Sequence, residues 1–201
     1  MAEKTVAALP KDYTPRLKAL YKGVVVEEVK KRFFLENIWQ VPRLRKIVVN
    51  MGVGQGKEDV KYFDQMKEDL SFLTGQTPCV RRAKKSIATF KIRQGQAIGL
   101  KVTLRASRMW EFLDRLTNIC LPRIRDFRGL ATEAFDAQGN YNLGLKEHHI
   151  FPEVSLERSA RAHGMNVTIV TSSTSAAHVL SVLELLGMPF RKSTKAKKQE
   201  D

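Results

Sequence analysis

Three short stretches of this chain alternate apolar and polar residues with the two-residue period of a half-buried β-strand. They span residues 44–53, 99–106 and 167–172. In a pleated strand this alternation places aliphatic side chains on one face of a sheet and polar side chains on the other. A fold that contains such strands needs a covering layer on the aliphatic face. The polar positions include Lys46, Asn50, Lys101, Thr103, Arg105 and Thr168.

Helical patterns lie between and around these strands. Apolar residues recur at three- to four-residue spacing in four further stretches, 15–34, 59–74, 107–121 and 175–186. We expect Val60 to lie on the buried side of the second helix and Ser107 to cap the third. No linker interrupts residues 13–190, so the pattern predicts one α+β domain between tails at 1–12 and 191–201. The expected domain has two layers, a mixed, largely antiparallel sheet with helices packed on one face, and a long basic loop.

The net charge of the 201-residue chain is +14, from 35 Lys and Arg against 21 Asp and Glu. Its distribution is uneven, because no acidic residue occurs between Leu70 and Trp110 while nine basic residues do. So many like charges repel each other unless a polyanion neutralises them. We interpret the stretch as a nucleic-acid surface. An anionic membrane is the weaker alternative, because the stretch ends in a strand pattern and lacks a basic amphipathic helix.

Candidate catalytic chemistry is sparse. Metal-dependent RNA cleavage needs clustered carboxylates, and the basic stretch holds none. His148 and His149 are adjacent and would point to opposite sides of a strand, so we expect no metal site and no cofactor. Cys79 and Cys120 are expected to be small buried or half-buried side chains, and the absence of a disulfide framework or apolar leader favours a cytoplasmic protein. A binding protein is favoured. An RNA-processing enzyme that uses the same basic surface remains the alternative.

Nine motifs then occur together in the order and spacing of a known family. They are KIVVNMGVG at 46–54, LSFLTGQTP at 70–78, AKKSIA at 83–88, FKIRQG at 90–95, GLKVTLR at 99–105, MWEF at 109–112, LPRIRDFRG at 121–129, GNYNLG at 139–144 and IFPE at 150–153. This run of motifs resembles the bacterial form of the large-subunit ribosomal protein L5 family. The likeness extends from about residue 13 to residue 192. It implies a non-catalytic, ribosome-bound protein that binds 5S rRNA in the central protuberance. A non-ribosomal RNA-binding module with the same basic surface is the alternative to that function.

The resemblance also implies where the RNA binds. Family members hold 5S rRNA on the open face of the sheet, and 23S rRNA and neighbouring proteins of the central protuberance are further implied partners. Neutral polar side chains can contact ribose hydroxyls and follow the shape of the RNA backbone, while basic side chains contact phosphates. The matching neutral positions are Asn50, Gln76 and Thr103, with Lys46, Lys101 and Arg105 supplying charge around them.

Two further surfaces follow from the same resemblance. The basic loop at 81–98 would reach tRNA in the peptidyl site, and Phe90 would either stack on a base or anchor the loop. The region at 123–144 would face the head of the small subunit and contact a protein there. The tRNA-binding candidates are Arg81, Arg82, Lys84, Lys85, Phe90, Lys91 and Arg93. The inter-subunit candidates are Arg123, Arg125, Asp126, Arg128, Asn140 and Tyr141.

Overall fold

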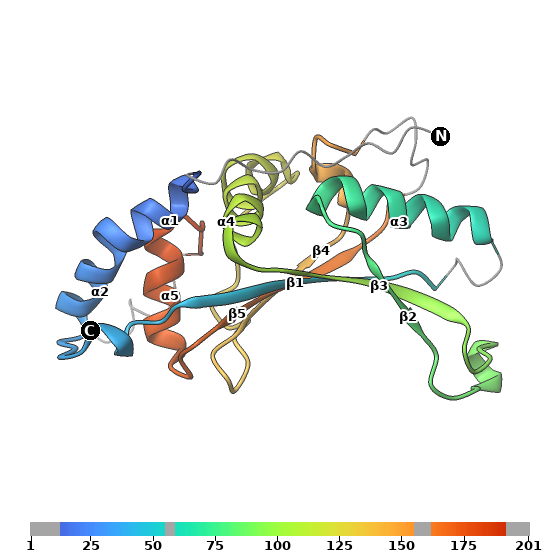
Figure 1. Cartoon of the computed structure of the whole chain (residues 1–201), viewed down its shortest axis with the longest axis horizontal. Coiled ribbons are helices and arrows are strands. Elements are labelled where there is room, and N and C mark those ends of the chain that lie inside the picture. Colours follow the sequence, from blue (N-terminus) through green and yellow to red (C-terminus); the bar gives the residue numbers. More distant parts are fainter. Residues whose placement is uncertain (1–12, 55–58, 155–161, 192–201) are drawn as a thin grey trace, which may run out of the picture.

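The computed structural model describes residues 13–54, 59–154 and 162–191, which contain four helices and five strands (Figure 1). The first helix is α1 (Arg16–Leu20), which continues through a π-helical turn into α2 (Val26–Arg32). The others are α3 (Val60–Thr74), α4 (Ala106–Arg115) and α5 (Ala176–Leu185). The strands are β1 (Leu44–Gly52), β2 (Cys79–Arg82), β3 (Ala97–Leu104), β4 (Tyr141–Leu145) and β5 (Met165–Thr171). The tails predicted at 1–12 and 191–201 lie outside the described residues, except for Arg191.

The five strands form one sheet in the order β2-β3-β1-β5-β4. The predicted α+β class is confirmed, with one correction to the sheet. All four pairings between these strands are antiparallel, so the sheet is not mixed within the described residues. Leu130 and Phe190 form a parallel contact, but this contact is an isolated bridge outside the strands. β1 and β2 run in the same direction on either side of β3, because α3 carries the chain back along the sheet between them.

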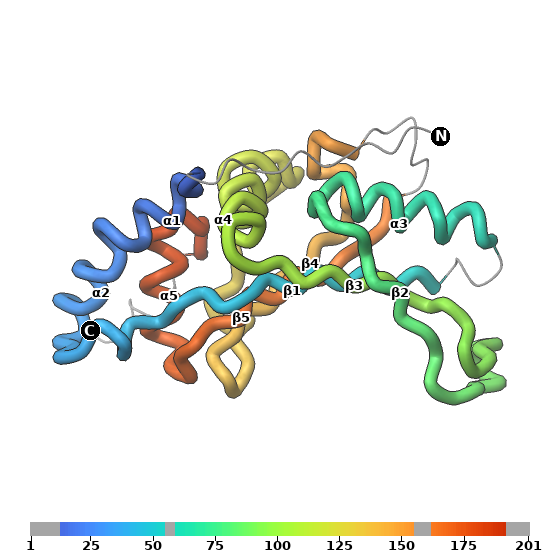
Figure 2. The backbone as a smooth tube through the Cα atoms, in the orientation of Figure 1, coloured from blue at the N-terminus to red at the C-terminus, as the bar shows by residue number. Residues whose placement is uncertain are grey.

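Helices cover one face of the sheet and leave the other open, as predicted. In Figure 1, α3 and α4 lie above the sheet, while α1, α2 and α5 group at one end of it. The hairpin between β2 and β3 projects at the opposite end, as the tube in Figure 2 also shows. Among the described residues, no helix lies over the lower face in this view. That face is therefore available to a partner.

The alternation in the strands decides which side chains enter the core. Ile47 and Val49 of β1 are fully buried, and Phe112 of α4 is fully buried with them. One cluster of buried side chains extends along the chain from Leu17 to Met188. Burial of apolar surface contributes about 25 cal/mol per Å², and it is the main stabilising term for this arrangement.

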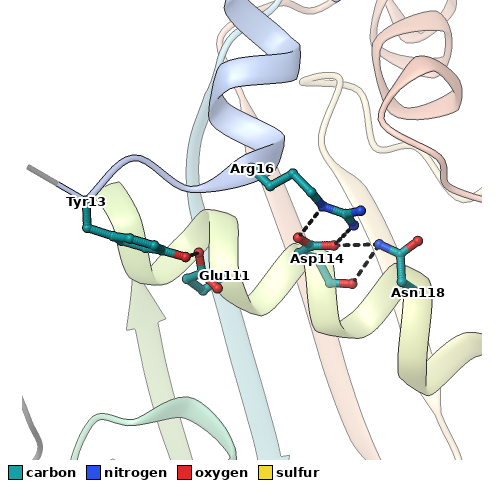
Figure 3. A network of polar contacts seen from close by, with 5 residues as sticks. All are labelled: Tyr13, Arg16, Glu111, Asp114 and Asn118. Atoms are coloured by element: carbon teal, nitrogen blue, oxygen red, sulfur yellow. Dashed lines mark hydrogen bonds and ion pairs between the residues drawn. The ribbon is translucent and has the colours of Figure 1, made fainter. Parts of the chain in front are cut away.

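Polar contacts join the start of the chain's first helix to α4 (Figure 3). The Arg16 guanidinium binds both carboxylate oxygens of Asp114, and the Asn118 amide donates to the same carboxylate. The Tyr13 hydroxyl donates to Glu111, and this hydrogen bond raises the pKa of Tyr13. Arg16 is exposed and Asp114 is half-buried, so water weakens this ion pair and it orients the first helix more than it stabilises the fold.

Three local expectations differ from the structure. Val60 is 72% exposed, because it is the first residue of α3 and precedes the buried stripe of that helix. Ser107 does not cap α4, which begins one residue earlier at Ala106 without a side-chain cap. Cys79 is exposed because it starts the edge strand β2, whereas Cys120 is buried as expected. A position at the start of a helix or at the edge of the sheet overrides the local pattern in these cases.

Candidate nucleic-acid interface

The open face consists of rows of side chains that cross the sheet. Residues two apart in a strand share a face, and neighbouring strands lie about 4.8 Å apart, so each row places its members side by side. One row crosses all five strands. From β2 to β4 it contains Cys79, Lys101, Asn50, Asn166 and Gly144. The next row crosses four strands with Thr103, Val48, Thr168 and Asn142.

These two rows have a distinct chemistry. None of their nine members is acidic, and none is aromatic. Amide and hydroxyl groups can donate and accept, and the Thr168 hydroxyl already donates to the Asn142 Oδ1 atom at 2.8 Å. Without rings the rows cannot stack bases. They are suited to ribose hydroxyls and phosphates, with Lys101 supplying charge.

The structure brings together Asn50, Thr103 and Lys101, which the sequence selects as RNA-binding residues. It also adds Asn142 and Asn166, which the sequence prediction misses. The signal for Asn166 is present, because it begins the alternation that continues through Thr168. Asn142 lies in a strand too short to show a convincing alternation.

Three other predicted residues lie at the margins of the rows. Lys46 is half-buried and pairs with Val170 beyond an irregularity at the start of β1, on the same face as Asn50. Arg105 is exposed and directly follows β3. Gln76 lies outside the sheet, in the connection from α3 to β2, where its backbone bonds to the Thr74 hydroxyl. The structure therefore does not place Gln76 in either row.

The predicted basic loop is a structured extension of the β2–β3 hairpin. The Ala83 amide donates to the Gln96 carbonyl at 2.8 Å, and Ile87 and Ile92 exchange two backbone hydrogen bonds further out. A single helical turn, Ala88–Phe90, forms the tip. The basic side chains are presented around this frame, and Arg81, Arg82, Lys84, Lys85, Lys91 and Arg93 are all exposed.

Three of the predicted tRNA-binding residues differ in their local roles. Arg82 donates from Nη1 to the Gly95 carbonyl at 2.9 Å, so it also closes the hairpin. Arg81 lies opposite Gly99 on the same face as Cys79, and therefore joins the edge of the open face. Phe90 is 62% exposed at the tip, which favours the stacking alternative over an anchor.

The third predicted surface lines a cleft of about 670 Å³ beside β4. Arg123, Arg125 and Arg128 contribute positive charge to its rim, and all three are exposed. Asp126 and Glu147 lie on the same cleft and make it less suitable for phosphates than the hairpin. Mixed charge around an apolar floor is typical of a protein contact.

Asn140 and Tyr141, predicted to contact the same partner, lie inside the molecule. They are 8% and 1% exposed. The Asn140 amide donates to Asp136, and its Oδ1 atom accepts from the Thr171 amide at 3.2 Å. The Tyr141 hydroxyl donates to the Ala131 carbonyl at 3.0 Å. Both side chains hold the turn in place instead of presenting a surface.

The fold and the site together define a class of protein. An antiparallel sheet with one acid-free polar face, next to a cationic hairpin, is an arrangement for binding a polyanion. No helix in the described part of the chain has the length and apolar character to cross a membrane.

Comparison with known proteins identifies the family. A family model described as "Ribosomal protein L5" matches residues 37–93, and the model for the family's C-terminal part matches residues 97–190. The chain is 50% identical over 176 residues to large ribosomal subunit protein uL5 of Thermus thermophilus, an alignment of 88% of this chain and 97% of that protein. It is 49% identical over 184 residues to uL5 of Corynebacterium kroppenstedtii, covering 92% of this chain and all of that protein.

This chain belongs to the ribosomal protein L5 family. It is a structural constituent of the large ribosomal subunit and not an enzyme. The resemblance stated from the sequence motifs is confirmed, and so are the expected role in translation and the expected location on the ribosome. The alternatives of an RNA-processing enzyme and a non-ribosomal module are excluded.

Proposed function

We propose that the open face of the sheet binds 5S rRNA and anchors it in the central protuberance. The observation that best supports this is the row from Cys79 to Gly144, which carries Asn50 and Asn166 beside Lys101 without a carboxylate. Such a row can contact ribose and phosphate groups across the width of the sheet. Its neutral amides have no favourable partner on a purely apolar ligand.

The basic hairpin is proposed to contact tRNA in the peptidyl site. Its exposed charges, Lys84, Lys85, Lys91 and Arg93, surround a frame that projects away from the helical layer. Phe90 at the tip would stack on a base or ribose. Arg81 and Arg82 would contribute charge nearer the sheet.

The cleft beside β4 is proposed to contact a protein in the head of the small subunit. Arg123, Arg125, Asp126 and Arg128 would form that contact, while Asn140 and Tyr141 position the segment from within. Contacts with 23S rRNA and with neighbouring proteins of the central protuberance belong to the same proposal. We also propose that residues 13–190 form a single domain.

Binding of a 5S rRNA transcript by the full chain tests the main assignment. Affinity would be measured over a series of salt concentrations. Asn50→Ala and Thr103→Ala should each weaken binding by roughly fivefold, the effect of losing one hydrogen bond of about 1 kcal/mol. Neither should change the salt slope, because neither side chain carries charge. Lys101→Ala should reduce the slope by about one.

A matched control is Lys61→Ala, which removes an exposed lysine from α3, in the helical layer. This variant should bind 5S rRNA with a nearly unchanged slope. Wild-type affinity in the Asn50 and Thr103 variants would contradict the proposed face. A protein that binds no 5S rRNA at any salt concentration would contradict the proposed ligand.

A further inference from the structure

The connection between α2 and β1 exposes two large aromatic side chains that none of the surfaces above uses. Phe34 is 92% exposed and Trp39 is 72% exposed. By contrast Trp110, the other tryptophan of the chain, is 6% exposed in the core. Ile38, between them in the sequence, is 60% exposed. Exposed apolar side chains that occur together commonly mark a binding site.

Trp39 is held on a rigid support. It lies in a single helical turn, Ile38–Gln40, and its amide donates to the Asn37 Oδ1 atom at 2.9 Å. Val41, which follows this turn, is fully buried. The Pro42 carbonyl accepts a hydrogen bond of 2.8 Å from the Tyr21 hydroxyl. The ring is therefore presented from a fixed backbone, so little conformational entropy is lost when a ligand binds it.

A cation accompanies the ring. The Arg43 guanidinium carbon lies 4.7 Å from the centre of the Trp39 ring, which is cation–π distance. The backbone of Arg43 is also fixed, because its amide donates to the Ser172 hydroxyl at 2.9 Å and its carbonyl accepts from the Ser172 amide at 3.0 Å. An exposed indole and a guanidinium are thus held together at one point of the surface.

We propose that Trp39 and Arg43 bind one unpaired RNA nucleotide. The base would stack on the indole and the guanidinium would contact the nucleotide's phosphate. The inference rests on the proposed RNA-binding function and extends it, because the rows of the open face lack aromatic residues and cannot supply stacking. It adds a stacking site at the start of β1, the strand that carries Asn50.

Charge favours RNA over a protein partner at this site. Arg45 and Lys46 lie two and three residues after Arg43, and the one carboxylate in the connection from residue 33 to residue 43 is that of Glu36. Arg45 is exposed and Lys46 half-buried on the open face. A stacked nucleotide at Trp39 would therefore be continuous with RNA held on the rows.

Tryptophan fluorescence gives a direct test, because the full chain contains only Trp39 and Trp110. The probes are a 5S rRNA transcript, a single-stranded octamer of adenylate, and a duplex of the same length. Stacking on Trp39 should quench emission with 5S rRNA or with the octamer, and the duplex should quench much less. Trp39→Phe should abolish the quenching while keeping most of the affinity, since a phenyl ring still stacks.

Affinity for the quenching RNA provides the second readout. Trp39→Ala should lower it by roughly 5- to 150-fold without changing the salt slope, whereas Arg43→Ala should reduce the slope by about one. Ile119→Ala is the matched control, because Ile119 is an exposed apolar residue (42%) that follows α4, away from this connection. Circular dichroism would confirm that each variant folds.

Absence of quenching by both 5S rRNA and the octamer would overturn the proposal, as would unchanged RNA affinity in Trp39→Ala. Loss of a protein, instead of RNA, from large subunits reconstituted with Trp39→Ala would assign the ring to a protein contact and would also overturn it. These failures are separable from failure of the open face. If the open face were wrongly assigned, the Asn50 and Thr103 variants would bind 5S rRNA like wild type while Trp39→Ala would still bind it more weakly.

Discussion

The open face and the basic hairpin are built in opposite ways. Asn50 and Asn166 are neighbours on the open face although they lie in distant parts of the sequence. The hairpin at 81–98 is closed by local bonds, such as the one from Arg82 to Gly95, only 13 residues away. The first surface consists mainly of neutral groups around Lys101 and depends on four strand pairings, whereas the second is cationic and depends mainly on its own turn.

This difference separates two tasks in RNA binding. Charge attracts phosphates over several ångströms and tolerates imprecise placement. Neutral amides and hydroxyls act only at hydrogen-bond distance, so they need a rigid frame. The molecule places its neutral groups on the sheet and many of its charges on the hairpin. Variants that alter one of the two regions and spare the other test that division.

Alanine substitutions at two glycines test whether the turn before β4 is more constrained than the hairpin. Both have positive φ, +74° at Gly139 and +82° at Gly95, and alanine at either position should cost about 1–2 kcal/mol for that conformation alone. A Cβ atom at Gly139 would also lie 2.1 Å from the Ser173 carbonyl oxygen, while one at Gly95 would meet nothing within 4 Å. Urea unfolding should show a loss of at least about 3 kcal/mol for Gly139→Ala and a smaller loss for Gly95→Ala. Equal losses would show that the turn at the sheet is no more constrained than the hairpin.

Acid should lower the free energy of unfolding of the domain and leave the phosphate contacts of the hairpin unchanged. His148 is fully buried, and its burial, with His149 beside it, lowers its pKa from 6.5 to about 4. A hydrogen bond between the His148 ring and the His163 backbone opposes this shift of the pKa without reversing it. The unfolded chain therefore binds a proton between pH 6.5 and about 4 that the folded chain does not. This contribution is fully present above pH 6.5 and is lost as the pH falls toward 4, about 3 kcal/mol in all.

Urea unfolding at pH 7 and at pH 4.5 measures that contribution. His148→Asn keeps an acceptor near the Nδ1 position and removes the titration, so its free energy of unfolding should depend less on pH. The hairpin at 81–98 contains no His, Asp or Glu, so its phosphate contacts should not change over this range. An unchanged pH dependence in His148→Asn would refute the assignment to this residue.

Removing the charge of the hairpin should separate the two proposed RNA contacts. A variant with Lys84, Lys85, Lys91 and Arg93 all changed to alanine should lose tRNA from the peptidyl site of reconstituted subunits roughly tenfold faster, because four phosphate contacts are lost. Its binding of 5S rRNA should keep the wild-type salt slope, since charges beyond about 10 Å are largely screened at 0.1 M salt. Loss of 5S rRNA with normal tRNA retention would show that the two surfaces are assigned in reverse.

The smallest expected effect concerns a residue that only the register selects. Asn166→Ala should weaken 5S rRNA binding roughly fivefold with an unchanged salt slope, as for Asn50→Ala. Gln138→Ala is the matched control, because Gln138 is an exposed amide on the turn before β4 and lies in neither row. If Gln138→Ala weakened binding as much as Asn166→Ala, neutral contacts would not be confined to the open face.

Much of the fold follows from local pattern. The alternation around Asn50 and around Thr103 predicts which face of β1 and β3 is polar, because side chains in a strand alternate whatever the strand pairs with. The apolar spacing from 107 to 121 likewise predicts the buried side of α4, where Phe112 is fully buried. Local rules failed where tertiary position decides exposure, as at the exposed Cys79 of the edge strand.

The family motifs, the acid-free run of positive charge and the polar faces of single strands are all evident in the sequence, because each is a property of neighbouring residues. The placement of Asn166 and Gly144 in the row of Asn50 comes from the tertiary structure, because antiparallel register is set by contacts between distant segments. The tertiary structure also decided that Asn140 and Tyr141 are buried while Trp39 is exposed. Burial depends on what the rest of the chain packs against a side chain, and no local pattern contains that information.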